Sequence, residues 1–120
     1  MKLRNFIKSL GLLALFFGPT AYSAAFECVV PAGRILFYED GSVNIFHNGR
    51  QNYTFICNLN EEWKGISQQT CAVWSASLST AYKNGNHVRF YYNEDGMSSC
   101  SELPIYGNAP PPVYVGVENY

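Results

Sequence analysis

The sequence predicts a small β-rich α+β domain in which one helix separates three strands from two, with two disulfides. Short runs of β-branched and aromatic residues alternate with turn pairs such as Asp40-Gly41, which is typical of a strand meander. Between residues 67 and 85 the apolar period lengthens to that of a helix. Four cysteines follow an export signal, which favours disulfides in an oxidising compartment.

Residues 1–25 are predicted to be a secretory signal peptide. Basic residues precede an apolar core that ends in small residues: Lys2, Arg4, Lys8, Leu10–Gly18 and Ser23–Ala25. The core is too short to span a bilayer, so we expect cleavage near Phe26 and no membrane insertion afterwards. Residues 26–120 then form a single secreted or periplasmic domain, and the leader also suits a bacterium.

Three strands are expected before the helix, at residues 34–39, 42–48 and 53–57. Asp40-Gly41 tolerates the positive backbone angles of a type I′ turn, and Asn48-Gly49 provides the second turn. His47 alternates with apolar neighbours, so we interpret it as a structural residue at a sheet margin and not as a catalytic one.

A helix is expected to begin after Ser67, a suitable N-cap, and to end at Gly85, which can take the left-handed conformation. The predicted inner face consists of Cys71, Trp74, Leu78, Ala81 and Tyr82. Trp74 is interpreted as a core anchor.

Two further strands are expected at residues 87–92 and 113–117. In the first, Val88, Phe90 and Tyr92 share one face, and His87, Arg89 and Tyr91 share the other. Three prolines at residues 110–112 form a stiff, extended entry into the second.

This order of elements is that of a five-stranded OB-like barrel with one α-helix between strands 3 and 4. A cystatin-like or open α+β sheet is the alternative. Four cysteines allow three pairings, and the barrel topology favours Cys57–Cys71 and Cys28–Cys100. No cysteine pair has zinc-site spacing, so we expect no metal and no cofactor.

Three segments resemble the subtilase cytotoxin B-subunit family: Val73–Thr80 (VWSASLST), Val88–Tyr92 (VRFYY), and YTFIC followed by Cys71. That family belongs to the cell-binding B subunits of A-plus-five-B bacterial toxins, which include pertussis-like members. The resemblance implies an OB fold, a homopentamer, an enzymatic A subunit as partner, and a shallow pocket for sialylated glycans to which Tyr92 contributes.

Charge and motifs favour binding over catalysis. Three of the eight basic residues lie in the leader, which leaves five against nine acidic residues, too few and too scattered for a nucleic-acid surface. Residues 26–120 contain two His and nine carboxylates with no recognised catalytic signature around them, and the adjacent carboxylates Glu61-Glu62 and Glu94-Asp95 are interpreted as solvated, so we expect no enzyme.

The expected function is adhesion to a cell-surface glycan. Aromatic rings pack on the apolar faces of sugars, and polar side chains reach their hydroxyls and carboxylates. The candidate ligand-binding residues are Tyr92, Tyr91, Arg89, Tyr106 and Asn108. The alternatives are a stand-alone protein-interaction module, which uses an edge strand or the proline-rich loop, and a secreted inhibitor.

Overall fold

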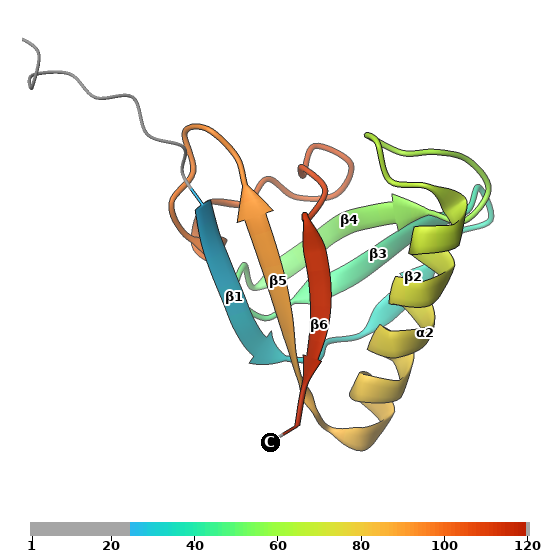
Figure 1. Ribbon diagram of the computed structural model, residues 1–120, viewed down its shortest axis with the longest axis horizontal. Helices are drawn as coiled ribbons and strands as arrows, with labels where there is room; N and C mark the ends of the chain where they lie inside the picture. Colours follow the sequence, from blue (N-terminus) through green and yellow to red (C-terminus); the bar gives the residue numbers. More distant parts are fainter. Residues whose placement is uncertain (1–24, 120) are drawn as a thin grey trace, which may run out of the picture.

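The computed structural model describes residues 25–119, so the predicted signal peptide up to residue 24 lies outside the described residues. Two three-stranded antiparallel sheets face each other, with strand orders β1-β5-β6 and β2-β3-β4 (Figure 1). The elements are β1 (Ala25–Pro31), β2 (Ile35–Phe37), β3 (Ser42–His47), β4 (Asn52–Asn58), α2 (Gln68–Asn84), β5 (His87–Asn93), the 3-10 turn η1 (Cys100–Glu102) and β6 (Tyr114–Glu118).

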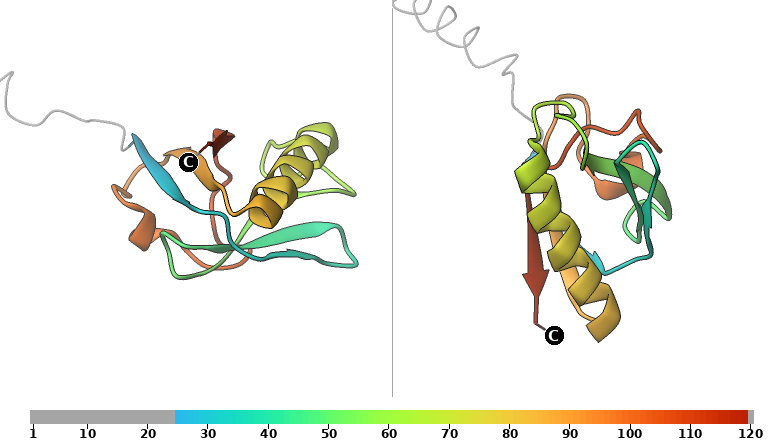
Figure 2. Two further views of the ribbon diagram at one scale, coloured as in Figure 1. Left: turned by 90° about the horizontal axis from the view of Figure 1, so that it is seen from below. Right: turned by 90° about the vertical axis from the view of Figure 1, so that its right-hand side faces the viewer.

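The fold is β-rich α+β, as predicted, but the described residues form no closed five-stranded barrel. Six strands lie in two open sheets, and neither sheet pairs β4 with β6. The helix α2 contacts β4, β5 and β6 and runs along one side of the two sheets (Figures 1 and 2). The helix therefore fills the gap that strand pairing would close in a barrel.

The strand that the sequence analysis missed is β1. It pairs with β5 along its whole length, from Ala25 opposite Asn93 to Pro31 opposite His87. Its side chains alternate as a strand requires, with Phe26 and Cys28 buried and the intervening residues exposed. The segment directly follows the predicted leader and ends at Pro31, before Ala32-Gly33, so its alternation was not recognised in the sequence.

The chain passes from one sheet to the other through residues 32–34. The Ala32 N–H donates to the Asn86 carbonyl (3.1 Å), and the Phe46 N–H donates to the Arg34 carbonyl (2.8 Å). A Cβ atom on Gly33 would lie 1.9 Å from the Phe46 carbonyl oxygen, so only glycine fits at this crossing.

The two hairpin turns differ from the expectation. Gly41 has a positive φ (92°) but Asp40 does not, so the β2–β3 connection is a turn followed by a left-handed glycine and not type I′. The Gly41 N–H donates to the Tyr38 carbonyl (2.9 Å), which closes the turn. Between β3 and β4 the left-handed residue is Gln51 (φ 59°).

The helix α2 has both predicted caps. The Ser67 hydroxyl accepts a hydrogen bond from the Thr70 N–H (3.1 Å), and Gly85 adopts a left-handed conformation (φ 70°). Trp74 is buried in the core, as expected. Tyr82 is 49% exposed, so its place on the inner face was wrong: in the last turn of the helix the buried position is that of Ala81.

Two disulfides join the sheets to their surroundings, and they have the pairing inferred from the topology. Cys28–Cys100 connects β1 to η1, with Cα atoms 5.9 Å apart, and Cys57–Cys71 connects β4 to α2, at 5.4 Å. Such bonds are typical of proteins that fold in an oxidising compartment.

Candidate functional site

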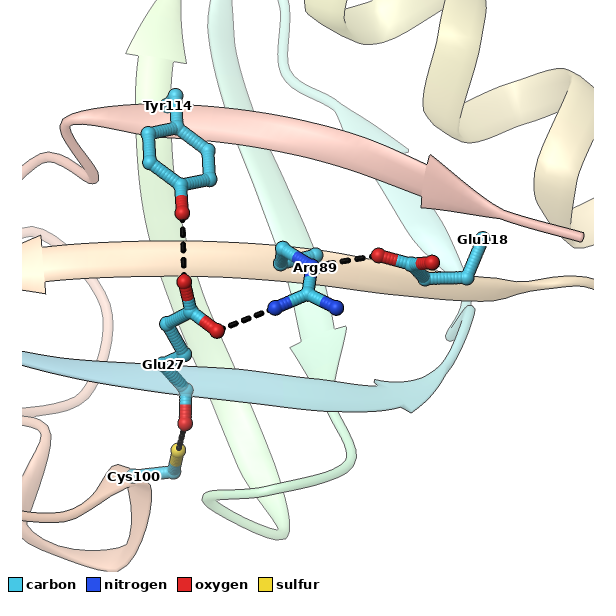
Figure 3. A network of polar contacts seen from close by, with 5 residues as sticks. All are labelled: Glu27, Arg89, Cys100, Tyr114 and Glu118. Carbon is cyan, nitrogen blue, oxygen red and sulfur yellow. Dashed lines mark hydrogen bonds and ion pairs between the residues drawn. The ribbon is translucent and has the colours of Figure 1, made fainter.

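The outer face of the β1-β5-β6 sheet carries Arg89 and Tyr91, two of the predicted site residues. The Arg89 guanidinium forms ion pairs with Glu27 on β1 and Glu118 on β6 (Figure 3). The Tyr114 hydroxyl donates to the other Glu27 carboxylate oxygen (2.6 Å). We call these four residues, Glu27, Arg89, Tyr114 and Glu118, the Arg89 network.

The contacts within the Arg89 network stabilise the charged forms of Glu27 and Arg89. The hydrogen bond from Tyr114, with the nearby Arg89 charge, lowers the pKa of Glu27. The same hydrogen bond raises the pKa of Tyr114, and the contact with Glu118 raises the pKa of Arg89. One cation thus faces two carboxylates. The network favours neither a ligand carboxylate nor any other anion.

Tyr91 contributes a flat aromatic surface beside the network. Its ring is parallel to that of Tyr114, with centroids 5.0 Å apart and 4° between the planes. Gly116 lies opposite Arg89 on β6, so no side chain of β6 projects from the sheet at this position. The charged groups of the Arg89 network thus have partners within the protein and need no ligand.

Tyr92 does not fit the role that the family resemblance implies. Its side chain is fully buried between the sheets and stacks on Phe26, with ring centroids 5.4 Å apart. Burial raises the pKa of the Tyr92 hydroxyl, which has no hydrogen-bond partner among the described residues. The reason is register: Tyr92 shares the inward face of β5 with Val88 and Phe90, so it is a core residue.

Tyr106 and Asn108 lie apart from Arg89, in the loop that runs along the β4 edge of the other sheet. The Tyr106 N–H donates to the Tyr53 carbonyl (2.9 Å), and the Tyr106 carbonyl accepts from the Phe55 N–H (3.2 Å). Asn108 is exposed. The five predicted residues therefore do not form one site: Arg89 and Tyr91, Tyr92, and the loop pair occupy three different places.

The structure contains a pocket that the sequence analysis did not predict. It has a volume of about 420 Å³, opens to solvent, and is lined by Ala32, Gly33, Arg34, Phe46, Asn48, Tyr53 and Tyr82. We call it the Arg34 pocket. Its residues come from the crossing between sheets, from β3 and β4, and from the end of α2, so no single stretch of sequence could reveal it.

The polar groups of the Arg34 pocket are open for contacts. Among the described residues Arg34 has no ion-pair or side-chain hydrogen-bond partner, whereas Arg50, Lys64 and Arg89 all donate to fixed acceptors. The Asn48 amide group donates to the Pro31 carbonyl (2.7 Å), which leaves its oxygen as an acceptor. No carboxylate lines the pocket.

Its apolar surface is aromatic. The Phe46 and Tyr53 rings meet edge to face, with centroids 5.4 Å apart and 79° between the planes. Tyr82 contributes a third, largely exposed ring. A guanidinium, an amide oxygen and three rings can bind a small anionic ligand that has apolar faces.

His47 is not available for catalysis. It is fully buried, and its Nδ1 accepts a hydrogen bond from the Gly49 N–H (3.1 Å). Its ring packs against Phe90, with centroids 4.9 Å apart. Burial lowers the pKa of His47 to about 4, so the ring is neutral at neutral pH. His47 was expected at a sheet margin and instead lies where the two sheets meet.

The described residues contain no group of three or more His, Cys, Asp or Glu side chains that could hold a metal ion. Within the same part of the chain, every helix is too short or too polar to cross a membrane. No protein-family model, no curated protein and no solved structure matches this chain.

Proposed function

We propose that this protein is a secreted or periplasmic, non-catalytic binding module that recognises an acidic glycan on a cell surface through the Arg34 pocket. The observation that carries the proposal is the unpaired Arg34 guanidinium, which lies in an aromatic pocket without carboxylates. A sialylated glycan supplies the complementary chemistry.

The guanidinium suits the carboxylate of such a sugar because its planar N–H groups match two carboxylate oxygens at once. Tyr53 and Tyr82 offer ring faces and edges to the apolar side of a pyranose. The free Asn48 amide oxygen can accept a hydrogen bond from a hydroxyl or an N-acetyl N–H. The pocket thus provides one partner for each chemical feature of the ligand.

The sheet arrangement supports a distant relation to the B subunits of A-plus-five-B toxins. Only residues 32–34 separate β1 from β2, so the two strands can be regarded as one bent strand. The resulting order, β4-β3-β2/β1-β5-β6, is compatible with an opened OB barrel. A pentameric ring that docks an enzymatic A subunit belongs to the same proposal, and light scattering that gives a five-fold mass would support it.

Replacement of the Arg34 charge tests the pocket. Arg34→Gln should weaken binding of 3′-sialyllactose about ten- to hundredfold, since a hydrogen-bonded charge pair contributes about 1.5–3 kcal/mol. Arg89→Gln is the matched control, because Arg89 is already paired with two carboxylates. Titration calorimetry on the purified protein measures both. Equal loss in the two variants, or retention in Arg34→Gln, would contradict the proposal.

A second candidate is a protein-interaction module that uses the β6 edge. This strand lies at the edge of its sheet and exposes Val113, Tyr114 and Val117 at or beside it. Edge strands offer unpaired backbone groups to a partner strand. A monomer that binds no sialylated sugar but captures an extended peptide would favour this function over the first.

A further inference from the structure

Tyr106 has an unusual backbone conformation for an exposed aromatic residue. Its φ is 53°, in the left-handed region that L-residues adopt only at a cost and that glycine adopts freely. The residue is 43% exposed, so a large part of its ring still faces solvent and can receive a ligand. Strained residues of this kind gather at functional sites.

The loop does not depend on the Tyr106 side chain for its position. The two backbone hydrogen bonds to β4, with Tyr53 and Phe55, use main-chain atoms that any residue supplies. The Lys64 ammonium donates to the carbonyls of Gly107 and Ala109, each at 2.8 Å, and fixes the next turn of the loop. A glycine at position 106 would keep these main-chain contacts and lose the ring with its contacts to Tyr53 and Phe55.

The ring continues the aromatic surface of the Arg34 pocket. Tyr106 lies nearly parallel to Tyr53, with centroids 6.4 Å apart and 27° between the planes. Tyr53 in turn lines the pocket and meets Phe46. The row Phe46, Tyr53, Tyr106 therefore leads from the guanidinium outward to an exposed ring.

We propose that Tyr106 is a second binding platform and that the ligand is an acidic oligosaccharide, with its acidic sugar in the Arg34 pocket and the adjoining sugar on the Tyr106 ring. This inference rests on the proposed function and extends it from a single sugar to at least two. A glycan is favoured over an apolar peptide because the row begins at an unpaired cation and its pocket has no carboxylate.

The test compares two probes, the methyl glycoside of N-acetylneuraminic acid and 3′-sialyllactose, by titration calorimetry on the purified protein. The wild type should bind the trisaccharide about tenfold more tightly, the size of effect that one aromatic contact provides. Tyr106→Gly should remove this gain and leave the affinity for the monosaccharide unchanged. Its urea midpoint should fall only modestly, because relief of the left-handed strain offsets part of the lost ring contacts with Tyr53 and Phe55.

Two further variants separate the ring from the loop. Tyr106→Asn tolerates the left-handed conformation but lacks the ring, so it should behave as Tyr106→Gly does in binding. Tyr106→Phe keeps the ring and should keep the gain.

Four results would overturn the inference. Equal wild-type affinity for both probes, or an unchanged gain in Tyr106→Gly and Tyr106→Asn, would remove the platform and leave the pocket intact. Capture of an apolar peptide through Tyr106 without any sugar dependence would replace the ligand class. If the wild type binds neither sugar, the proposed function itself fails, and the platform fails with it.

Discussion

Two surfaces of the protein each combine an arginine with aromatic rings, and they differ in what the arginine contacts. On the β1-β5-β6 sheet, Arg89 lies between Glu27 and Glu118 beside the parallel Tyr91 and Tyr114 rings. In the Arg34 pocket, the guanidinium has similar aromatic neighbours and no carboxylate. Residue types alone therefore do not define an anion site. The charges already satisfied within the protein decide which arginine is free.

The two sheets also differ in their disulfides, since each sheet carries one. Removal of these bonds should cause the largest loss of stability. Cys28→Ala/Cys100→Ala should lower the free energy of unfolding by about 4 kcal/mol and Cys57→Ala/Cys71→Ala by about 3 kcal/mol, since longer closed loops restrict the unfolded chain more. The sequence separations are 72 and 14 residues. Urea unfolding measures both, and the reverse order would show that packing around Cys57–Cys71 outweighs loop length.

Acid should weaken the contact between the two sheets through His47, which packs against Phe90 from the other sheet. Its pKa is about 4 when folded and about 6.5 when unfolded, so the unfolded chain binds more protons between these values. The contribution of neutral His47 to the free energy of unfolding is therefore fully present above pH 6.5. It is lost as the pH drops toward 4, by about 3 kcal/mol in total.

Urea unfolding from pH 7 to pH 5 isolates this effect, because Glu27 and Asp40, with lowered pKa values, lose their contribution only at lower pH. His47→Gln is the control, since its amide does not titrate. The variant should be less stable at pH 7 but nearly independent of pH in this window. A wild-type curve that is equally flat would show that His47 takes up its proton as readily in the folded chain as in the unfolded chain.

The smallest effect is expected on the satisfied surface. Arg89→Gln removes a partly exposed cation whose ion pairs are screened by solvent, so the urea midpoint should stay close to that of the wild type at physiological salt. Glu118→Gln should behave in the same way. A large loss in either variant would mean that the Arg89 network supports the sheet and would weaken its contrast with the Arg34 pocket.

Local patterns allowed most of the elements to be predicted. The helix has its predicted caps at Ser67 and Gly85, and the alternation over His87–Tyr92 correctly placed Val88, Phe90 and Tyr92 on one face of the strand. The structure shows that this face is the buried one. A functional role was assigned to Tyr92 from the family resemblance, and its complete burial overrides that role.

The site depends on contacts between segments that are distant in sequence, and these could not be predicted. Glu27 neutralises Arg89 across 62 positions, from a strand that the sequence analysis did not recognise. The Arg34 pocket joins the sheet crossing to Tyr82, which was expected on the inner face of the helix. Tyr106 was named as a candidate, but its left-handed φ became visible only in three dimensions.

The crossing at Gly33 has a consequence for how a ligand meets the protein. Because main chain rests on main chain there, with no room even for a methyl group, the base of Arg34 is anchored as firmly as the hydrogen-bonded backbone itself. The Arg34 pocket is therefore preorganised, and a bound sugar loses little binding free energy to the ordering of the site. Folding and ligand binding therefore depend on the same residue: a mutation that gives residue 33 a side chain would disturb the sheet crossing and the Arg34 pocket together.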